Sequence, residues 1–296
     1  MKSIFRIFFV FSVLFLTADL FAQTTTKAPC CETAENEDCK FEAVDKFASF
    51  GNDAGFRNIH PNPLPSDYKD FKGETITYSL DDGTTASGYL VKSAVPSNKW
   101  IFVFQEWWGL NDYIKKESDE INNDLGAVNV LALDLYDGKV ATTREEASKY
   151  VQSVDKNRIY KMISGASTYA GSDAQIATLG WCFGGTWSLQ AAIELGSKCD
   201  ACVFYYGQPE GSIERLSKLE CPVLMVWASQ DKSITDSTVT AFQKNMETAG
   251  KSLVVLTYDA SHGFANPSNP NHNQEATINS KLKVLSFLKT NLMDNN

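Results

Sequence analysis

The hexapeptide Gly180-Trp181-Cys182-Phe183-Gly184-Gly185 decides how this chain folds. It follows the apolar run at 175–179 and precedes a helix-like stretch at 186–195. Strand, sharp turn and helix are the context that a Gly-x-nucleophile-x-Gly turn requires, with cysteine here in the place usually held by serine. Glycines let the strand end pack against the helix start where a Cβ would clash. The turn therefore predicts that Cys182 is an open, exposed nucleophile at a helix N-terminus, where the dipole favours its thiolate.

The regions around this turn repeat a strand and helix pattern. Eight strand-like runs lie at 74–80, 86–92, 100–105, 128–133, 175–179, 201–206, 222–228 and 252–258. Helical stretches lie at 113–125, 144–164, 184–196, 236–249 and about 275–292. Asp81-Asp82-Gly83 predicts a hairpin between the first two strands, whereas the later strands are continuous apolar runs separated by helices. The pattern predicts an α/β fold with a mostly parallel eight-stranded sheet and helices on both faces, which is the α/β-hydrolase plan, with its chemistry at the carboxyl ends of the strands.

The beginning of the chain predicts export. Lys2 and Arg6 precede an apolar stretch at 7–16, and small residues follow as far as Ala22. This pattern is typical of a secretory signal peptide cut after Ala22. A retained anchor is the alternative, although the apolar run is too short to span a bilayer. We expect a periplasmic or secreted protein.

Three segments follow from this interpretation. Residues 1–22 form the signal peptide, residues 23–71 form an N-terminal extension, and residues 72–296 form the main domain. The extension begins as a polar, partly flexible stretch, contains a short helix at 41–50 that docks on the main domain, and has a proline-rich segment at 57–68 that is extended or turned. No internal repeat is evident.

The charge of the chain excludes some classes of partner. With 27 Lys and Arg against 36 Asp and Glu, its net charge is −9, and it has no basic run. We therefore expect no binding to nucleic acid or to anionic membranes. After signal cleavage we expect no membrane association. The sequence does not predict the oligomeric state.

Cysteine usage separates Cys182 from six other thiols. An exported protein can oxidise its thiols, so the other six are compatible with up to three disulfides. We expect a bridge from Cys199 or Cys202 to Cys221, because the three flank neighbouring strands. The alternatives are a redox pair formed by Cys199 and Cys202, or a zinc site using three cysteines and a fourth ligand. The remaining cysteines are Cys30, Cys31 and Cys39 in the extension.

The chain contains three histidines, of which one is suited to be a general base. His262 follows the last strand and precedes the final helix, so it comes last in the usual order of nucleophile, acid and histidine. A structural loop histidine is the alternative. His60 lies in the proline-rich segment and His272 in an Asn/Pro loop, and both are expected to be ordinary surface residues.

The acid of this order should follow the strand at 222–228. Asp231 does so, and it would accept the proton of one ring nitrogen of His262. Asp236 is the second candidate, but it is expected to be the N-cap of the next helix, and an N-cap is also the alternative role for Asp231.

A loop after the strand at 100–105 supplies further candidates. The backbone N–H of Trp107 would pair with that of Phe183 to hold an oxyanion. Glu106 would be partly desolvated between tryptophans, which raises a carboxyl pKa, and a carboxylate satisfied by backbone donors is the alternative. Trp107, Trp108 and Trp181 are expected to wall an apolar cleft, although core packing explains them as well.

Four motifs in order resemble the dienelactone hydrolase family over about residues 72–292. They are Gln-Glu-x-x-Gly-x-Asn at 105–111, Gly-x-Cys-x-Gly-Gly at 180–185, Gln-Asp at 230–231 and His-x-Phe-Ala at 262–265. The resemblance implies that Cys182 is the nucleophile, His262 the base and Asp231 its partner. It also implies that Glu106 helps deprotonate the thiol when substrate arrives.

The resemblance extends to substrate binding, with one departure. Arg144 matches the arginine that binds the substrate carboxylate in the family, with a solvated helix arginine as the alternative. The second such arginine would stand at position 266, where this chain has Asn266.

The predicted function is a cysteine-dependent hydrolase of small-molecule carboxylic esters or lactones, acting through an acyl-enzyme and requiring no metal or organic cofactor. Arg144 would hold an anionic group of the substrate. The alternatives are an exported, non-catalytic binding protein on the same scaffold and a thiol-redox protein.

Overall fold

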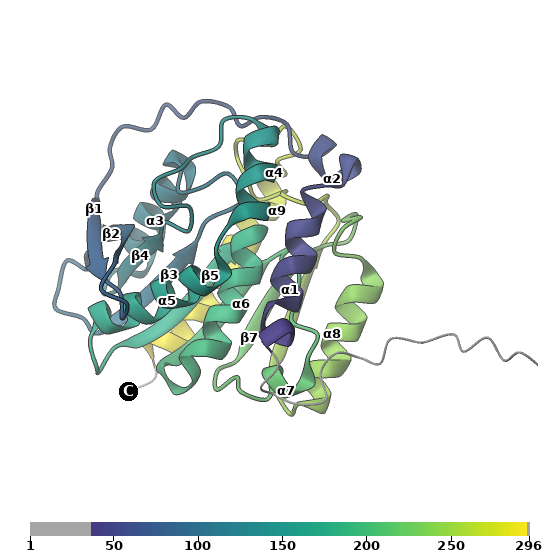
Figure 1. The fold of residues 1–296 in the computed structure, drawn as a ribbon. Helices are drawn as coiled ribbons and strands as arrows, with labels where there is room; N and C mark the ends of the chain where they lie inside the picture. Colours follow the sequence, from purple (N-terminus) through teal and green to yellow (C-terminus); the bar gives the residue numbers. More distant parts are fainter. Residues whose placement is uncertain (1–36, 295–296) are drawn as a thin grey trace, which may run out of the picture.

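The computed structural model describes residues 37–294. The predicted signal peptide and the cysteines at 30 and 31 lie outside these residues. Figure 1 shows a twisted sheet with helices on both faces.

The eight predicted strands all form and join one sheet in the order β1-β2-β4-β3-β5-β6-β7-β8. The pairs β1–β2 and β2–β4 are antiparallel, and every pair from β4 through β3 to β8 is parallel. The strands are β1 (Glu74–Ser79), β2 (Thr85–Val91), β3 (Lys99–Phe104), β4 (Asn129–Leu133), β5 (Gln175–Trp181), β6 (Cys199–Tyr205), β7 (Val223–Ala228) and β8 (Leu253–Tyr258). This arrangement confirms the α/β-hydrolase fold.

The register of the sheet brings the candidate residues to one edge. Phe104 is paired with Gly180, so the loop after β3 lies beside the turn after β5. Ala228 is paired with Tyr258, so the loops after β7 and β8 are also neighbours. Because parallel strands end at the same edge, four separate segments of the chain can contribute to one site.

Helices cover both faces of the sheet. In Figure 1, α1, α4, α5 and α6 lie in front of it, and α3 and α9 lie behind. The helices are α1 (Glu37–Phe50), α2 (Ala54–Asn58), α3 (Asp112–Leu125), α4 (Arg144–Ser153), α5 (Lys156–Ala170), α6 (Phe183–Leu195), α7 (Ile213–Leu216), α8 (Asp236–Thr248) and α9 (Gln274–Leu288).

The stretch at 144–164, expected as one helix, is two helices. Val154 ends α4 in an extended conformation, with φ −66° and ψ 136°. Asp155 then caps α5, accepting a hydrogen bond from the backbone N–H of Arg158. An aspartate cap of this kind competes with helix continuation, which is why the chain breaks there.

The extension packs against the main domain, as expected for the helix at 41–50. Helix α1 contacts α4 and α6, and it lies beside α6 in Figure 1. Phe47 from α1 is completely buried and Phe56 from α2 is 2% exposed, both within the main hydrophobic core. The described part of the extension therefore belongs to the same packed body as the sheet.

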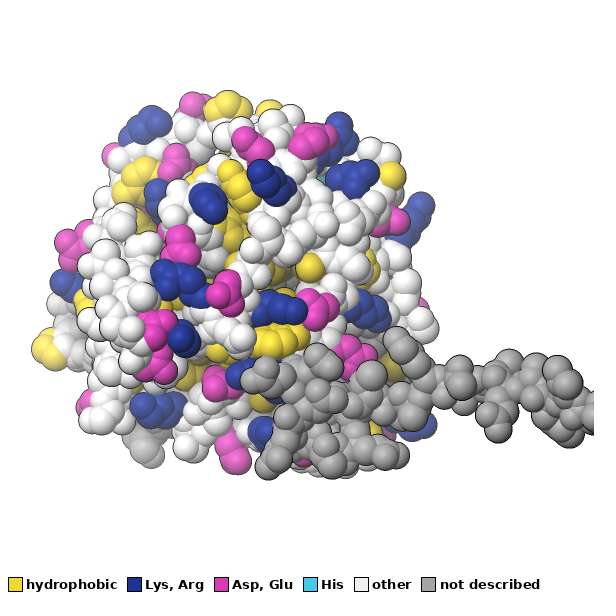
Figure 2. Space-filling model, in the orientation of Figure 1, with side chains coloured by type: hydrophobic (Ala, Val, Ile, Leu, Met, Phe, Trp, Pro, Cys, Tyr) yellow, Lys and Arg dark blue, Asp and Glu magenta, His cyan; other side chains and the backbone are white. Residues whose placement is uncertain are grey.

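The surface carries charges of both signs. Figure 2 shows Lys and Arg side chains interspersed with Asp and Glu over the visible face, without a large basic area there. Within residues 37–294, no helix has the length and apolar character needed to cross a bilayer.

Candidate functional site

The turn between β5 and α6 has the strained geometry that the hexapeptide predicts. Cys182 has φ 57° and ψ −117°, in the left-handed region that non-glycine residues rarely adopt. Its backbone N–H donates to the carbonyl oxygen of Tyr205 at 3.0 Å, which helps to hold this conformation. A Cβ at position 184 would lie 2.1 Å from the carbonyl oxygen of Phe104, so only glycine fits there. Strain of this kind is often kept at functional sites.

Cys182 is not in the open, contrary to expectation. Its exposed fraction is 1%. The extension covers the centre, because the ring of Phe56 lies 5.2 Å from that of His262 and the ring of His60 lies 4.8 Å from that of Trp107. The turn does carry the side chain to the sheet edge, but a segment outside the motif closes over it.

His262 and Asp231 form a buried pair. His262 Nδ1 lies 2.6 Å from Asp231 Oδ2, and both side chains are fully buried. The other carboxylate oxygen of Asp231 accepts the backbone N–H groups of Ser233 and Ile234, which orient it. Since an ionised carboxylate only accepts, Nδ1 carries the proton and Nε2 has a lone pair. The second acid candidate, Asp236, begins α8, whose N-cap is Thr235.

Glu106 is buried and close enough to Cys182 for its charge to affect the thiol. Burial raises the pKa of its carboxyl to about 8, and a hydrogen bond from Asn266 partly opposes this shift. The amide nitrogen of Asn266 donates to Glu106 Oε2, and its oxygen accepts the backbone N–H and the hydroxyl of Ser268, both at 2.8 Å. Asn266, singled out as the departure from the family pattern, is therefore the direct partner of Glu106.

The two expected oxyanion donors converge on the sulfur of Cys182. Burial and the charge of Glu106 raise the pKa of the thiol well above its usual value, and hydrogen bonds from the backbone N–H groups of Phe183 and Trp107 oppose this. The sulfur thus rests where these N–H groups point. A substrate oxygen that uses the same donors must displace it.

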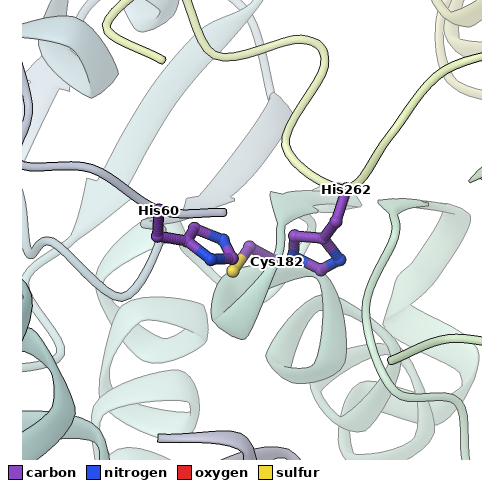
Figure 3. A group of neighbouring side chains, drawn as sticks. All are labelled: His60, Cys182 and His262. Atoms are coloured by element: carbon purple, nitrogen blue, oxygen red, sulfur yellow. The ribbon is translucent and has the colours of Figure 1, made fainter. Parts of the chain in front are cut away.

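His60 is a site residue that the sequence interpretation missed. It was expected at the surface but is 4% exposed, and its ring lies 5.0 Å from that of His262. Burial, and secondarily His262, lower its pKa to about 3. One ligand atom each of His60, Cys182 and His262 lie within 4.8 Å of one another, and Figure 3 shows the two rings directed toward the cysteine. Nothing in the Pro-rich context of His60 indicates this, since the position depends on how the extension docks. His272, also expected at the surface, is intermediate in burial.

Two cavities adjoin the centre. One, of about 90 Å³, is lined by Glu106, Trp181 and Asn266, among others. A larger one, of about 880 Å³, reaches His262 between the extension and the loops after β7 and β8. Of the three tryptophans, Trp181 lines a cleft, whereas Trp107 and Trp108 are buried in the core, as the alternative held.

Arg144 contacts the extension. Its backbone N–H donates to the side-chain oxygen of Asn62 at 3.0 Å, and its guanidinium donates to that of Asn58 at 3.2 Å. The guanidinium also lies 3.5 Å from Glu145, and Arg144 does not line either cavity. In this conformation Arg144 links the extension to the start of α4 through these hydrogen bonds.

The cysteines of the main domain are unpaired. Cys182, Cys199, Cys202 and Cys221 are free and buried, so none of these four forms a disulfide. The sulfur atoms of Cys199 and Cys221 lie 3.5 Å apart, whereas Cys202 contacts Ser188. Cys199 and Cys202 therefore face different partners, unlike a redox pair.

Two curated enzymes are similar to this chain in sequence. The chain is 31% identical over 143 residues to a carboxymethylenebutenolidase of Pseudomonas sp., covering 45% of this chain and 59% of that enzyme. It is 25% identical over 232 residues to carboxymethylenebutenolidase 1 of Cupriavidus pinatubonensis, covering 71% of this chain and 97% of that enzyme.

A solved structure and a family model complete the comparison. A dienelactone hydrolase-like promiscuous phosphotriesterase from metagenomic libraries has a TM-score of 0.65 at 20% identity, covering 75% of this chain and 99% of the other, and supports the fold. The model of the dienelactone hydrolase family matches residues 86–292, well over half of the chain. The protein therefore belongs to the dienelactone hydrolase family.

Proposed function

We propose that the protein hydrolyses carboxylic esters or lactones with Cys182 as its nucleophile, through a covalent acyl-enzyme. The observation that carries this proposal is the orientation of His262. Its Nδ1 is bonded to Asp231 at 2.6 Å, and its Nε2, directed toward Cys182, has no hydrogen-bond partner among the described residues. A base held in one tautomer beside a thiol is the arrangement that nucleophilic catalysis requires.

Glu106 would receive the proton of the thiol. A carboxylate is a useful base near neutral pH when its pKa is close to the working pH, and burial raises the pKa of Glu106 to about 8. Once the proton has moved to Glu106, the thiolate turns away from the N–H groups of Trp107 and Phe183 toward the substrate. This turn vacates both donors for the carbonyl oxygen.

The thiolate then attacks the carbonyl carbon and a C–S bond forms. The negative oxygen of the tetrahedral intermediate accepts the N–H groups of Trp107 and Phe183, each worth about 3 kcal/mol of the barrier. The C–O bond breaks, and the alkoxide takes the proton that Glu106 held. In a lactone this alkoxide stays attached to the acyl group.

Water completes the cycle. His262 Nε2 takes a proton from a water molecule, whose oxygen attacks the thioester, while Asp231 stabilises the imidazolium. The C–S bond breaks, the carboxylic acid leaves, and the imidazolium returns its proton to the thiolate. The protein begins and ends this sequence with the same protons.

Turnover of esters and lactones by matched variants tests this proposal. We expect short-chain esters and lactones to be hydrolysed by the wild type and not by Cys182→Ala, whereas Cys202→Ser, which alters another buried free thiol, retains activity. In His262→Ala, which cannot activate water, the acyl-enzyme should accumulate and be visible as an added acyl mass on the peptide containing Cys182. Undiminished turnover by Cys182→Ala would exclude Cys182 as the nucleophile.

We also propose that the protein is exported and acts in the periplasm or outside the cell. The pattern of residues 1–22 supports export, and N-terminal sequencing of the mature protein should then begin at Gln23. An N-terminus at Met1 in the mature protein would contradict export.

Arg144 remains the proposed partner of an anionic substrate group. To bind such a group, its guanidinium would have to leave Asn58.

A further inference from the structure

Three metal-ligand side chains converge at the centre of the site. His60, Cys182 and His262 come from the extension, the turn after β5 and the loop after β8, and one ligand atom of each lies within 4.8 Å of the others. Figure 3 shows the two rings flanking the cysteine. All three side chains are buried, with exposed fractions of 4%, 1% and 0%.

Both histidines are oriented as metal-binding histidines are. His262 Nδ1 is bonded to the carboxylate of Asp231 at 2.6 Å, and His60 Nδ1 is 2.7 Å from the carbonyl oxygen of Phe56. Since both partners accept, each Nδ1 carries the proton and each Nε2 has a lone pair. A carboxylate or carbonyl behind the far nitrogen is the usual outer support of a metal-ligating imidazole.

Neither lone pair is engaged in a hydrogen bond in the described structure. His60 Nε2 and His262 Nε2 are both buried without a hydrogen-bond partner among the described residues. The catalytic scheme above uses His262 Nε2, but it has no role for His60. A buried nitrogen acceptor left unpaired is costly, so its position beside a thiol points to a ligand.

We propose that His60 Nε2, Cys182 Sγ and His262 Nε2 bind a thiophilic divalent transition metal ion such as Zn²⁺, with a fourth position for water. A set of one thiolate and two imidazoles favours Zn²⁺ over Mg²⁺ and Ca²⁺, which prefer oxygen ligands. Tetrahedral Zn²⁺ places such donors about 3.3 to 3.6 Å apart, so the present cluster must contract by about 1 Å. The cavity lined by His262 and Phe56 lies beside the cluster, and the ion enters when the contacts of the extension open locally.

Metal binding and hydrolysis exclude each other at this site. When the ion binds, the thiol releases its proton to solvent, and the sulfur and His262 Nε2 both form bonds to the metal. Neither is then available to a substrate, so the ion acts as a reversible inhibitor. The inhibition rests on the proposed function, whereas the binding does not. His60 lies outside the family match at 86–292, so this metal site depends on the extension.

Direct titration with Zn²⁺ tests the site without a substrate. The chelator-treated full protein is titrated in competition with a chromogenic zinc chelator. We expect the wild type to bind one equivalent, His60→Ala to bind at least about tenfold more weakly, and His272→Ala to bind as the wild type does. His272 is the matched control, since it is the histidine outside the cluster.

Cobalt identifies the sulfur as a ligand. Co²⁺ added to the wild type should produce a thiolate-to-metal charge-transfer band in the near ultraviolet, together with the visible bands of a tetrahedral site. The charge-transfer band should disappear in Cys182→Ala. Wild-type protein without this band would overturn the proposal, whatever the stability of the variants.

The remaining outcomes are equally decisive. Equal Zn²⁺ affinity in wild type and His60→Ala would remove His60 from the site, and His60→Gln serves if the alanine variant does not fold. Zn²⁺ should inhibit ester hydrolysis, and a chelator should restore it. If the wild type binds Zn²⁺ but hydrolyses no ester, the proposed function fails while the metal site stands.

Discussion

At the scale of single residues, the hydrogen bond between Asp231 and His262 sets the proton position on the imidazole. In Asp231→Asn the side-chain amide can present its N–H₂ to Nδ1, which favours the tautomer with the proton on Nε2 and removes the base. We expect kcat for ester hydrolysis to fall by about 10³ to 10⁴-fold. Asp259→Asn is the control, because Asp259 is exposed and its carboxylate accepts a hydrogen bond from the side chain of Gln230. A fall below tenfold would mean that the pair is structural.

The stability of the protein depends on pH through the ionisation of Glu106. Burial raises the pKa of its carboxyl from 4.5 to about 8, so the folded state favours the protonated form. The contribution of Glu106 to the free energy of unfolding is therefore fully present below about pH 4.5. It is lost as the pH rises through 8, by up to about 1.4 kcal/mol per pH unit. In Glu106→Gln, which resembles the protonated acid, this loss should be absent.

Chemical unfolding of both proteins at several pH values between 5 and 8 measures this difference. Burial and the charge of Glu106 hold the pKa values of Cys182 and Tyr206 well above their usual values, so both groups stay protonated in this range. The other charged groups near Glu106 are common to the two proteins: Lys116, Glu117, Glu120 and Lys281. Parallel stability curves for wild type and variant would show that Glu106 ionises at its ordinary pKa.

The residues that sequence could locate are those that directly follow a strand. Cys182, Asp231, His262 and Glu106 each lie at the carboxyl end of a strand, and the parallel sheet brings these ends together. His60 could not be found in this way. It reaches the site through the packing of Phe47 and Phe56, which is a tertiary event with no local pattern.

At the scale of elements, the turn between β5 and α6 depends on close backbone contact. In Gly184→Ala the new Cβ would lie 2.1 Å from the carbonyl oxygen of Phe104, which would force β3 and α6 apart. We expect the free energy of unfolding to fall by about 3 kcal/mol or more, with loss of activity. Gly211→Ala, where nothing lies within 4 Å of the added Cβ, should leave both unchanged. Thermal unfolding compares them.

The contact between the starts of β6 and β7 predicts a disulfide under oxidising conditions. The sulfurs of Cys199 and Cys221 are 3.5 Å apart, so a small side-chain rotation would allow a bond as an oxidant removes two hydrogen atoms. Peptide mapping of the protein from an oxidising compartment should find Cys199 linked to Cys221, with Cys202 free. A link from Cys202 would contradict this pairing.

Elements were predictable where the local signal was strong. The strands appear at their expected positions within about two residues, because buried parallel strands are continuous apolar runs. The break between α4 and α5 was missed, since the sequence keeps a helical pattern across it and the cap at Asp155 competes with that pattern only weakly. The sheet order around β3 and β4 also required the structure, because it depends on pairing between distant segments.

At the scale of the whole molecule, the described extension and the sheet should unfold together. Phe47 is completely buried in the main core, so Phe47→Ala should lower the free energy of unfolding by about 3 to 5 kcal/mol. Leu64→Ala is the control, since Leu64 is 59% exposed on the same extension. Unfolding monitored by circular dichroism and by tryptophan fluorescence should give coincident transitions. Two separate transitions would show that the extension is an independent layer.

The burial of Cys182 beneath Phe56 and His60 has a kinetic consequence. A side chain that is 1% exposed meets a reagent only after the molecule has opened locally. The observed rate of any thiol modification is then a product of two quantities, the fraction of time spent open and the reactivity of the sulfur while open. Mutations that only loosen the contacts of the extension, such as those between Arg144 and Asn58, should therefore accelerate labelling of a sulfur whose own chemistry is unchanged.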